Sequence, residues 1–501
     1  MIPRSWCGWW LASWTLFLLL ATGLAAGGAD QRLVDAVEDG DDDTARALVR
    51  EGVAVNEEQP DGTTALHWAV HRDHAELTAL LLEAGANANA TNRYGVSPVS
   101  VASTNGNVAI VAALLDAGAN PNAATPYGQT PLMTAARAGD PEVVTRLLAA
   151  GANPNVRESV RRQSALMWAA AGMNAGAARV LIEGGADVAA RSEAGMTPLV
   201  FAAREGDLAT VQVLLAGGAN INEAANDAIP RGSRDPTVGD VPAPPRLGSS
   251  VLATAIRNAH YKLAAWLVEQ GADPNLDGPR GTALHGLVRA RNCELTAMPC
   301  PTQTGTLDTL SLVKVLLAHG ADVNARMTAR PPTKGTYDGN AMSLVGATPF
   351  FLAVKAADTT LMRLLLEHGA DPKLGNSDDT PPLFVAAGLG FIEGQVHASE
   401  AEALEAVEIL VGLGENVTAT NARDETALHG AAYRGANSIV SYLVDRGADL
   451  WAEDDTGLLP VTVADGFRRG TGFRAHDETA ALLRELMGPD APTRNTDQGA
   501  R

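Results

Sequence analysis

The chain has 501 residues, of which 46% are hydrophobic, only 4% are aromatic and 50 are glycine. Aliphatic side chains with frequent turns favour a linear array of small repeats over several globular domains. With 58 acidic residues against 38 lysines and arginines the formal net charge is −20, which argues against nucleic acid and anionic lipid as the main partners.

The first 29 residues have the pattern of a secretory signal peptide. Arg4 is the only early charge, the run from Trp9 to Leu20 is nearly all apolar, and small residues follow. We expect cleavage near Ala25 to Ala29 and a protein exported to the periplasm or secreted. The alternative is an anchor to the membrane by residues 5–26, which are just long enough to cross a bilayer.

After the leader, a phrase of the form Gly-Ala-(Asn or Asp)-x-Asn recurs 33 or 34 residues apart. Its regular copies begin at Gly85, Gly118, Gly151, Gly185 and Gly218, and the fourth copy has alanine in place of the final asparagine. Looser copies begin at Gly52, Gly271, Gly320, Gly369, Gly414 and Gly447. A fixed period of this length predicts one small structural unit per repeat, stacked on its neighbours.

Each repeat also carries a short phrase that predicts the start of a helix, such as Thr64-Ala65-Leu66-His67 or Thr130-Pro131-Leu132-Met133. The hydroxyl caps free helix amides, and proline suits the first helical turn. A second helix with aliphatic pairs follows, and its closing glycine favours a left-handed cap. One such pair buries too little apolar surface to be stable alone, so the repeats must stack.

The period and the Thr-Pro-Leu-His phrase resemble the ankyrin repeat. The resemblance covers about Gln31 to Met487 and implies an all-α repeat solenoid, a stack of about 12 units with β-hairpin-like turns. The run from Thr426 to Ala436 looks similar to long ankyrin proteins of bacteria, which is consistent with a periplasmic setting.

The spacing divides the chain into regular repeats at 30–222, repeats with long insertions at 223–418, and closing repeats with a cap at 419–487. We expect a disordered tail at 488–501. Inserted loops often carry function, but extra loop length also costs little, so both interpretations remain open. The insertions lie at Asn226 to Gly248, Arg291 to Leu307, Met327 to Val345 and Gly388 to Glu402.

The second insertion holds Cys293 and Cys300. In an oxidising compartment we expect them to form a disulfide, worth about 2 kcal/mol. The alternative is a pair of free thiols.

The resemblance also locates a candidate binding face, because in ankyrin proteins the position after the Thr-Pro-Leu-His phrase faces the concave side. Carried over repeat by repeat, this position gives a ladder of Trp68, Val101, Thr134, Trp168, Phe201, Thr254, Leu352 and Val385. Tryptophan and phenylalanine are good interface anchors. Alternatively, some of these side chains pack against the hairpins of the next repeat.

Basic residues lie just beyond the ladder, at His71, Arg72, Arg137, Arg204, Arg257, Arg289, Lys355 and Arg434. An acidic or amphipathic partner would suit such a groove. Hairpin-tip residues extend the same rim, although such residues are often merely solvated: Arg93, Tyr94, Tyr127, Arg157, Arg161 and Arg162. The predicted binding residues are Trp68, His71, Arg72, Val101, Arg137, Trp168, Phe201 and Arg204.

Few features of the sequence indicate metal binding or catalysis. His67, His71 and His74 have a spacing that places three imidazoles on one helix face, as a zinc site would need. The ankyrin pattern instead assigns His67 to the turn motif and His74 to the junction between helices. Motifs for haem attachment, nucleotide binding and acyl transfer are missing from the sequence.

We therefore predict no metal, no cofactor and no enzymatic activity, and a monomer that binds a protein or peptide partner. Contact with a membrane is expected only if the leader stays uncleaved. Two alternatives remain: an enzyme with its site in the decorated middle repeats, or an effector secreted to another cell.

Overall fold

The computed structural model describes residues 30–226, 247–276, 278, 281–292, 305–328, 342–391, 398–467 and 475–493. The expected signal segment, the expected disulfide between Cys293 and Cys300, and most of the expected tail lie outside these residues. In the part of the chain that is described, no helix has both the length and the apolar character to span a bilayer.

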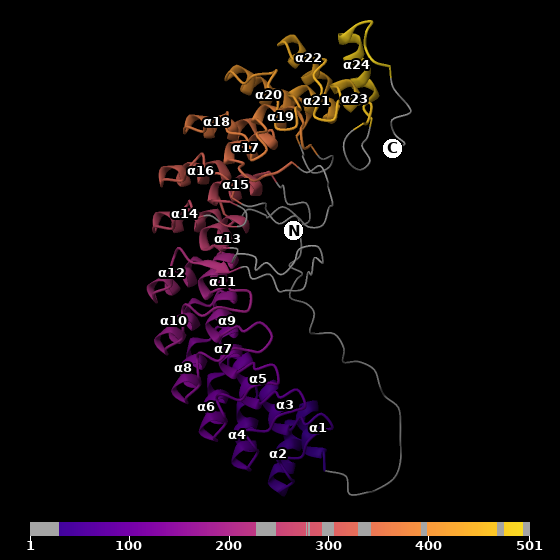
Figure 1. Cartoon of the computed structure of the whole chain (residues 1–501). Helices are drawn as coiled ribbons and strands as arrows, with labels where there is room; N and C mark the ends of the chain where they lie inside the picture. Colours follow the sequence, from indigo (N-terminus) through magenta and orange to yellow (C-terminus); the bar gives the residue numbers. More distant parts are fainter. Residues whose placement is uncertain are drawn as a thin grey trace, which may run out of the picture.

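The described residues contain 24 helices, which pack in consecutive pairs and form two layers of a curved stack (Figure 1). The odd-numbered helices lie along the concave side. They are α1 (Arg32–Asp39), α3 (Ala65–His71), α5 (Pro98–Asn105), α7 (Pro131–Ala138), α9 (Ala165–Ala171), α11 (Pro198–Glu205), α13 (Val251–Arg257), α15 (Ala283–Arg291), α17 (Pro349–Lys355), α19 (Pro382–Ala387), α21 (Ala427–Arg434) and α23 (Pro460–Ala464). We call these the inner helices.

The even-numbered helices form the outer, convex layer (Figure 1). They are α2 (Asp42–Glu51), α4 (Ala75–Glu83), α6 (Val108–Asp116), α8 (Pro141–Ala149), α10 (Ala175–Glu183), α12 (Leu208–Ala216), α14 (Tyr261–Glu269), α16 (Thr309–Ala318), α18 (Thr359–Glu367), α20 (Glu400–Gly412), α22 (Asn437–Asp445) and α24 (Asp477–Met487). The predicted all-α solenoid of about 12 units is thereby confirmed.

The helix boundaries follow the chemistry of the repeated phrases. At the start of α7 the Thr130 hydroxyl accepts a hydrogen bond from the Met133 amide at 3.4 Å, and Pro131 occupies the first helical position. After α8 the chain turns at Gly151, whose φ of +92° is in the left-handed region. A residue without a Cβ adopts this conformation at little cost.

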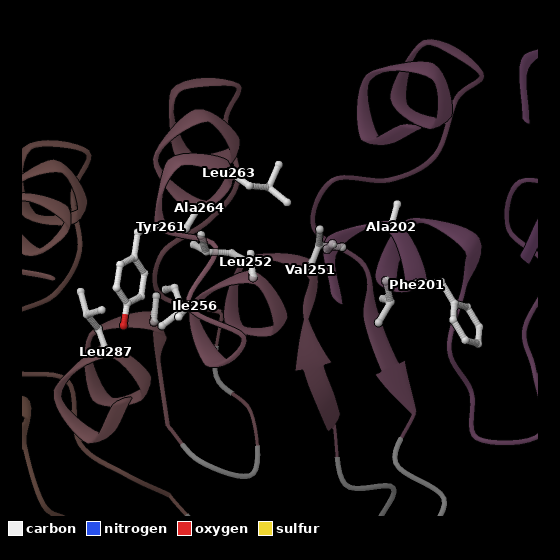
Figure 2. Packing of buried hydrophobic residues seen from close by; sticks show 14 of the residues in the cluster. Phe201, Ala202, Val251, Leu252, Ile256, Tyr261, Leu263, Ala264 and Leu287 are labelled. Atoms are coloured by element: carbon white, nitrogen blue, oxygen red, sulfur yellow. The ribbon is translucent and has the colours of Figure 1, made fainter. Parts of the chain in front are cut away.

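The core runs between the two layers and continues from repeat to repeat. Every inner helix from α1 to α21 packs against the inner helix of the next repeat, and most outer helices do the same. Figure 2 shows one junction, where Leu252 and Ile256 of α13 lie beside Tyr261 of α14 and Leu287 of α15. Because each repeat buries its apolar side chains largely against its neighbours, stability depends on these junctions.

The asparagine that ends each Gly-Ala-x-x-Asn phrase adds a polar link between repeats. The Asn122 side chain donates to the Gly151 carbonyl at 2.9 Å and accepts from the Asn153 amide at 2.8 Å. Both bonds recur at Asn56, Asn89, Asn155, Asn222, Asn275 and Asn324. We call this series the asparagine ladder.

The two described strands flank the first insertion. β1 (Ala224–Asn226) pairs antiparallel with β2 (Leu247–Ser250), so the insertion leaves the stack from a hairpin base. The helices on either side of the second insertion are α15 and α16. Arg291 joins them, because its guanidinium donates to the Thr309 hydroxyl at 2.9 Å and to the Asp358 carboxylate, the cap of α18, at 2.5 Å.

Candidate functional site

The predicted apolar ladder changes character along the stack. Its first four positions, on α3, α5, α7 and α9, are half-buried: Trp68, Val101, Thr134 and Trp168. The later positions are buried, with exposed fractions of 4% for Phe201, 1% for Thr254, 0% for Leu352 and 5% for Val385. The ladder is therefore open to solvent only in the N-terminal repeats, on what we call the inner face of α3 to α9.

Phe201 corrects the sequence-based expectation of an exposed anchor. Its ring belongs to the packed core of the stack, and the Arg204 guanidinium lies 4.9 Å from the ring centroid. Arg204 also forms an ion pair with Glu205 at 2.7 Å, which offsets its charge. Phe201 therefore serves packing, and Arg204 is a weaker candidate for a partner's acidic group than its sequence position indicates.

Trp68 is held in place by polar contacts from the first two repeats. Its indole Nε1 donates to the Gln59 side chain at 3.0 Å, and Gln59 in turn donates to the Glu38 carboxylate at 2.5 Å. Around it, His71 lies edge-on with ring centroids 5.7 Å apart, and Arg72 donates to the Glu38 carbonyl at 3.0 Å. Three predicted residues thus meet at one end of the inner face. Sequence reasoning missed the supporting pair, Gln59 and Glu38.

Trp168 forms the second aromatic position. The Arg137 guanidinium, on α7, lies 5.0 Å from its ring centroid, a geometry of attraction between a cation and an aromatic face. Unlike Trp68, the Trp168 indole Nε1 is buried and has no hydrogen-bond partner among the described residues. A buried donor left unpaired costs about 1 to 3 kcal/mol. The Trp168 indole therefore lies beside the Arg137 cation with its N–H group unpaired.

The two histidines that the ankyrin pattern assigned to structure do serve structure. The His67 Nδ1 accepts from the Thr64 amide at 3.2 Å, so Nε2 carries the proton and donates to the Val96 carbonyl at 3.1 Å. Burial lowers the pKa of His67 and favours this neutral form. Thr282 with His285 and Thr426 with His429 repeat the arrangement.

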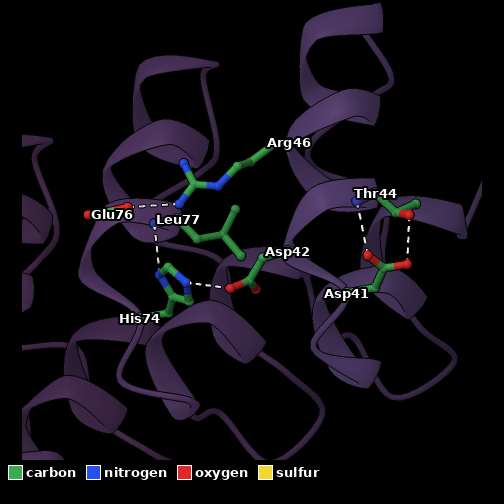
Figure 3. A network of polar contacts seen from close by, with 7 residues as sticks. All are labelled: Asp41, Asp42, Thr44, Arg46, His74, Glu76 and Leu77. Carbon is green, nitrogen blue, oxygen red and sulfur yellow. Dashed lines mark hydrogen bonds and ion pairs between the residues drawn. The ribbon is translucent and has the colours of Figure 1, made fainter.

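Both ring nitrogens of His74 also form hydrogen bonds within the fold (Figure 3). Its Nδ1 accepts from the Leu77 amide at 3.2 Å, which leaves Nε2 to donate to the Asp42 carboxylate at 2.6 Å. Since His67 and His74 use both ring nitrogens in the fold, a zinc site with His71 would have to break these bonds.

The hairpin tips before α5, α7 and α9 present a row of large exposed side chains. Tyr94 is 53% exposed, Tyr127 is 64% exposed and Val160 is 57% exposed. The two tyrosines are part of the predicted rim. Val160 was missed, although its place 33 residues after Tyr127 gave a signal for it.

Comparison with known families gives an independent result. A model of three consecutive ankyrin repeats matches residues 33–125, 84–158 and 132–225, and a model of the single repeat matches residues 345–377 and 423–455. Together the matches span about half of the chain. The chain belongs to the ankyrin-repeat family.

The matching relatives are diverse proteins that share the ankyrin segment. The chain is 30% identical over 118 residues to alpha-latrocrustotoxin-Lt1a of Latrodectus tredecimguttatus, which is 24% of this chain and 8% of the toxin. It is 31% identical over 149 residues to the B-cell lymphoma 3 protein homolog of Mus musculus, 28% of this chain and 31% of that protein.

A third relative is ankyrin repeat domain-containing protein 40 of Mus musculus, 36% identical over 74 residues, which is 15% of this chain and 20% of that protein. Each alignment spans less than a third of the relative, so it reflects the shared repeat. Ankyrin repeats are generally protein–protein interaction modules and typically lack catalysis.

Proposed function

We propose that this ankyrin protein is a non-enzymatic scaffold that holds a protein or peptide partner on the inner face of α3 to α9. The observation that carries the proposal is the change along the ladder: Trp68 and Trp168 remain half-exposed, whereas the equivalent positions from Phe201 onward are buried. A half-exposed tryptophan offers a large contact surface with few rotatable bonds.

The polar surroundings of the two rings support the same assignment. Trp68 is fixed by Gln59, so little side-chain entropy is lost when a partner covers it. The exposed Arg137 guanidinium lies against the half-exposed Trp168 ring, so a partner that covers this ring can pair an acidic group with the cation beside it. Both features favour the complex over the free chain.

We place this activity in the periplasm or outside the cell. The proposal rests on the leader-like pattern of residues 1–29, with a short apolar run followed by small residues. An epitope tag on the C-terminus, followed by fractionation of the native host and sizing of the tagged chain, tests it. A full-length chain in the cytoplasmic fraction would contradict export.

The binding proposal is tested by crosslinking capture from an envelope extract of the native host. The double variant Trp68→Ala with Trp168→Ala is expected to lose at least 90% of the specifically captured partner, because both anchors are gone. Trp451→Ala is the matched control, since this indole is 47% exposed but lies far from the inner face, in the loop after α22. Unchanged capture by the double variant, with an intact helical signal, would contradict the proposal.

A further inference from the structure

Three successive hairpin tips form one exposed surface, which we call the tip surface and define as residues 92–96, 125–129 and 157–163. The large side chains at the summits of these tips are Tyr94, Tyr127 and Val160, each more than half exposed. Exposed aromatic side chains at one fixed position in adjacent repeats are not needed for packing, and tyrosine is enriched in protein interfaces.

Backbone hydrogen bonds hold these tips in fixed positions. The Arg93 amide donates to the Asp61 carbonyl of the preceding tip at 2.7 Å, and the Ser159 amide donates to the Tyr127 carbonyl at 2.8 Å. The Glu193 amide, in the following tip, donates to the Arg161 carbonyl at 2.8 Å. The backbone of the tip surface is therefore hydrogen-bonded to both the preceding and the following tip, and its side chains project from a preorganised backbone.

The tip surface is positively charged in a chain that is strongly acidic overall. It carries the cations Arg93, Arg157, Arg161 and Arg162, and its one carboxylate is Glu158. Glu158 is only 4% exposed, and its carboxylate accepts hydrogen bonds from the amides of Val160, Arg161 and Gln163. This carboxylate is turned into its own loop, so the outward charge of the surface is that of its arginines.

The four arginines differ in whether their guanidinium groups already interact with other residues. Arg93 lies over the Tyr94 ring at 4.8 Å, and Arg157 donates to the Arg191 carbonyl at 3.1 Å. In contrast, the exposed guanidinium groups of Arg161 and Arg162 make no hydrogen bond or ion pair within the described part of the chain. Arginine is suited to bind carboxylates in a two-pronged geometry.

We propose that the tip surface binds an acidic segment of the protein partner, with carboxylates on Arg161 and Arg162 and apolar side chains on Tyr94 and Tyr127. This inference rests on the proposed function and adds the chemistry of the partner to it. Extended polyanions such as nucleic acid or an anionic membrane are disfavoured, because the net charge of −20 repels them beyond the patch. A short acidic segment meets only the local positive charge.

The test uses a phage library of random 12-residue peptides selected on the purified full chain. We expect the selected peptides to be enriched in Asp and Glu, and their affinity to fall at least tenfold in the variant Arg161→Glu with Arg162→Glu. Raising the salt concentration from 50 to 500 mM is expected to weaken binding in the wild type. Arg50→Glu with Arg179→Glu, two exposed arginines on outer helices, is the matched control and is expected to bind normally.

The remaining outcomes separate this inference from the proposed function. Selection of neutral or basic peptides whose binding is lost in Trp68→Ala with Trp168→Ala would contradict the proposal of an acidic segment. The same result would support the inner-face scaffold. Peptides that are insensitive to both sets of variants would overturn both proposals. Binding to phosphatidylglycerol vesicles that Arg161→Glu with Arg162→Glu abolishes would overturn the acidic segment in favour of a membrane surface.

Discussion

The side-chain amide of Asn155 donates a hydrogen bond to the carbonyl oxygen of Gly185, in the next repeat, at 2.9 Å. One repeat further on, the equivalent residue is Ala189, which has no side-chain amide that could donate to the Gly218 carbonyl. The asparagine ladder is interrupted there. The outer layer at this junction also has an open groove between α10 and α12, lined in part by Arg179, Ile182 and Gln212.

Ala189→Asn is expected to restore the missing link. The turn is already formed, because the Ala189 amide donates to the Asp187 side chain at 2.9 Å, just as the Asn155 amide donates to Asn153 at 3.0 Å. The new side chain then gains its bonds without rearrangement, and the free energy of unfolding should rise by about 1 kcal/mol. Urea unfolding followed by circular dichroism measures the change. Ala189→Gln is the control, and an equal gain there would contradict this account.

Phe201→Ala and Trp168→Ala change equivalent positions and should differ in their effects on stability and on partner capture. Phe201 is buried, so its truncation should lower the free energy of unfolding by about 3 to 5 kcal/mol. Trp168 remains half-exposed and should cost about 1 to 2 kcal/mol. Partner capture should fall in Trp168→Ala and stay unchanged in folded Phe201→Ala. A loss of capture in Phe201→Ala at a temperature where it remains folded would contradict the boundary that we draw on the inner face.

Arg291→Met is expected to destabilise the middle of the stack. The change leaves the Asp358 carboxylate, whose side chain is 8% exposed, without its ion-pair partner. Because Arg291 itself is partly solvated, we expect a loss of about 2 to 3 kcal/mol, below the range for fully buried pairs. Adding Asp358→Asn should recover part of the loss, since the amide removes the buried charge and still caps α18. Chemical unfolding of the single and double variants measures this, and no recovery would count against the assignment.

The neutral state of His67 predicts a dependence of stability on pH. Burial lowers the pKa of His67 in the folded chain below its ordinary value of 6.5. As pH falls below 6.5, the unfolded chain binds the proton first, so the free energy of unfolding decreases. His67→Gln keeps a capping side chain without this titration. The stability advantage of the wild type over His67→Gln should therefore shrink between pH 7 and pH 5, and a constant or growing advantage would contradict the assignment.

Much of this fold was predictable because its signals are local and repeated. Thr130 and Pro131 mark a helix start and Gly151 marks an end within one repeat, and the period reveals their stacking. The role of His67 was also predictable, since its partner Thr64 lies three residues away.

The difference between Trp168 and Phe201 was not predictable. Both follow the same motif, and what separates them is the packing of elements distant in sequence. The same holds for Trp68, because its support by Glu38 comes from the preceding repeat through Gln59. The site therefore emerges only from the assembled stack, and the expected export and disulfide remain predictions.

The most direct test of the scaffold is hydroxyl-radical footprinting of the chain alone and in complex with its captured partner. Mass spectrometry then reports the oxidation of each tryptophan and tyrosine. We predict that the partner protects Trp68, Trp168 and the tip residues Tyr94 and Tyr127 at least threefold, while Trp451 at the other end of the stack is oxidised equally in both states. Protection confined to Trp451 or the outer helices, with Trp68 and Trp168 unchanged, would contradict an inner-face binding site.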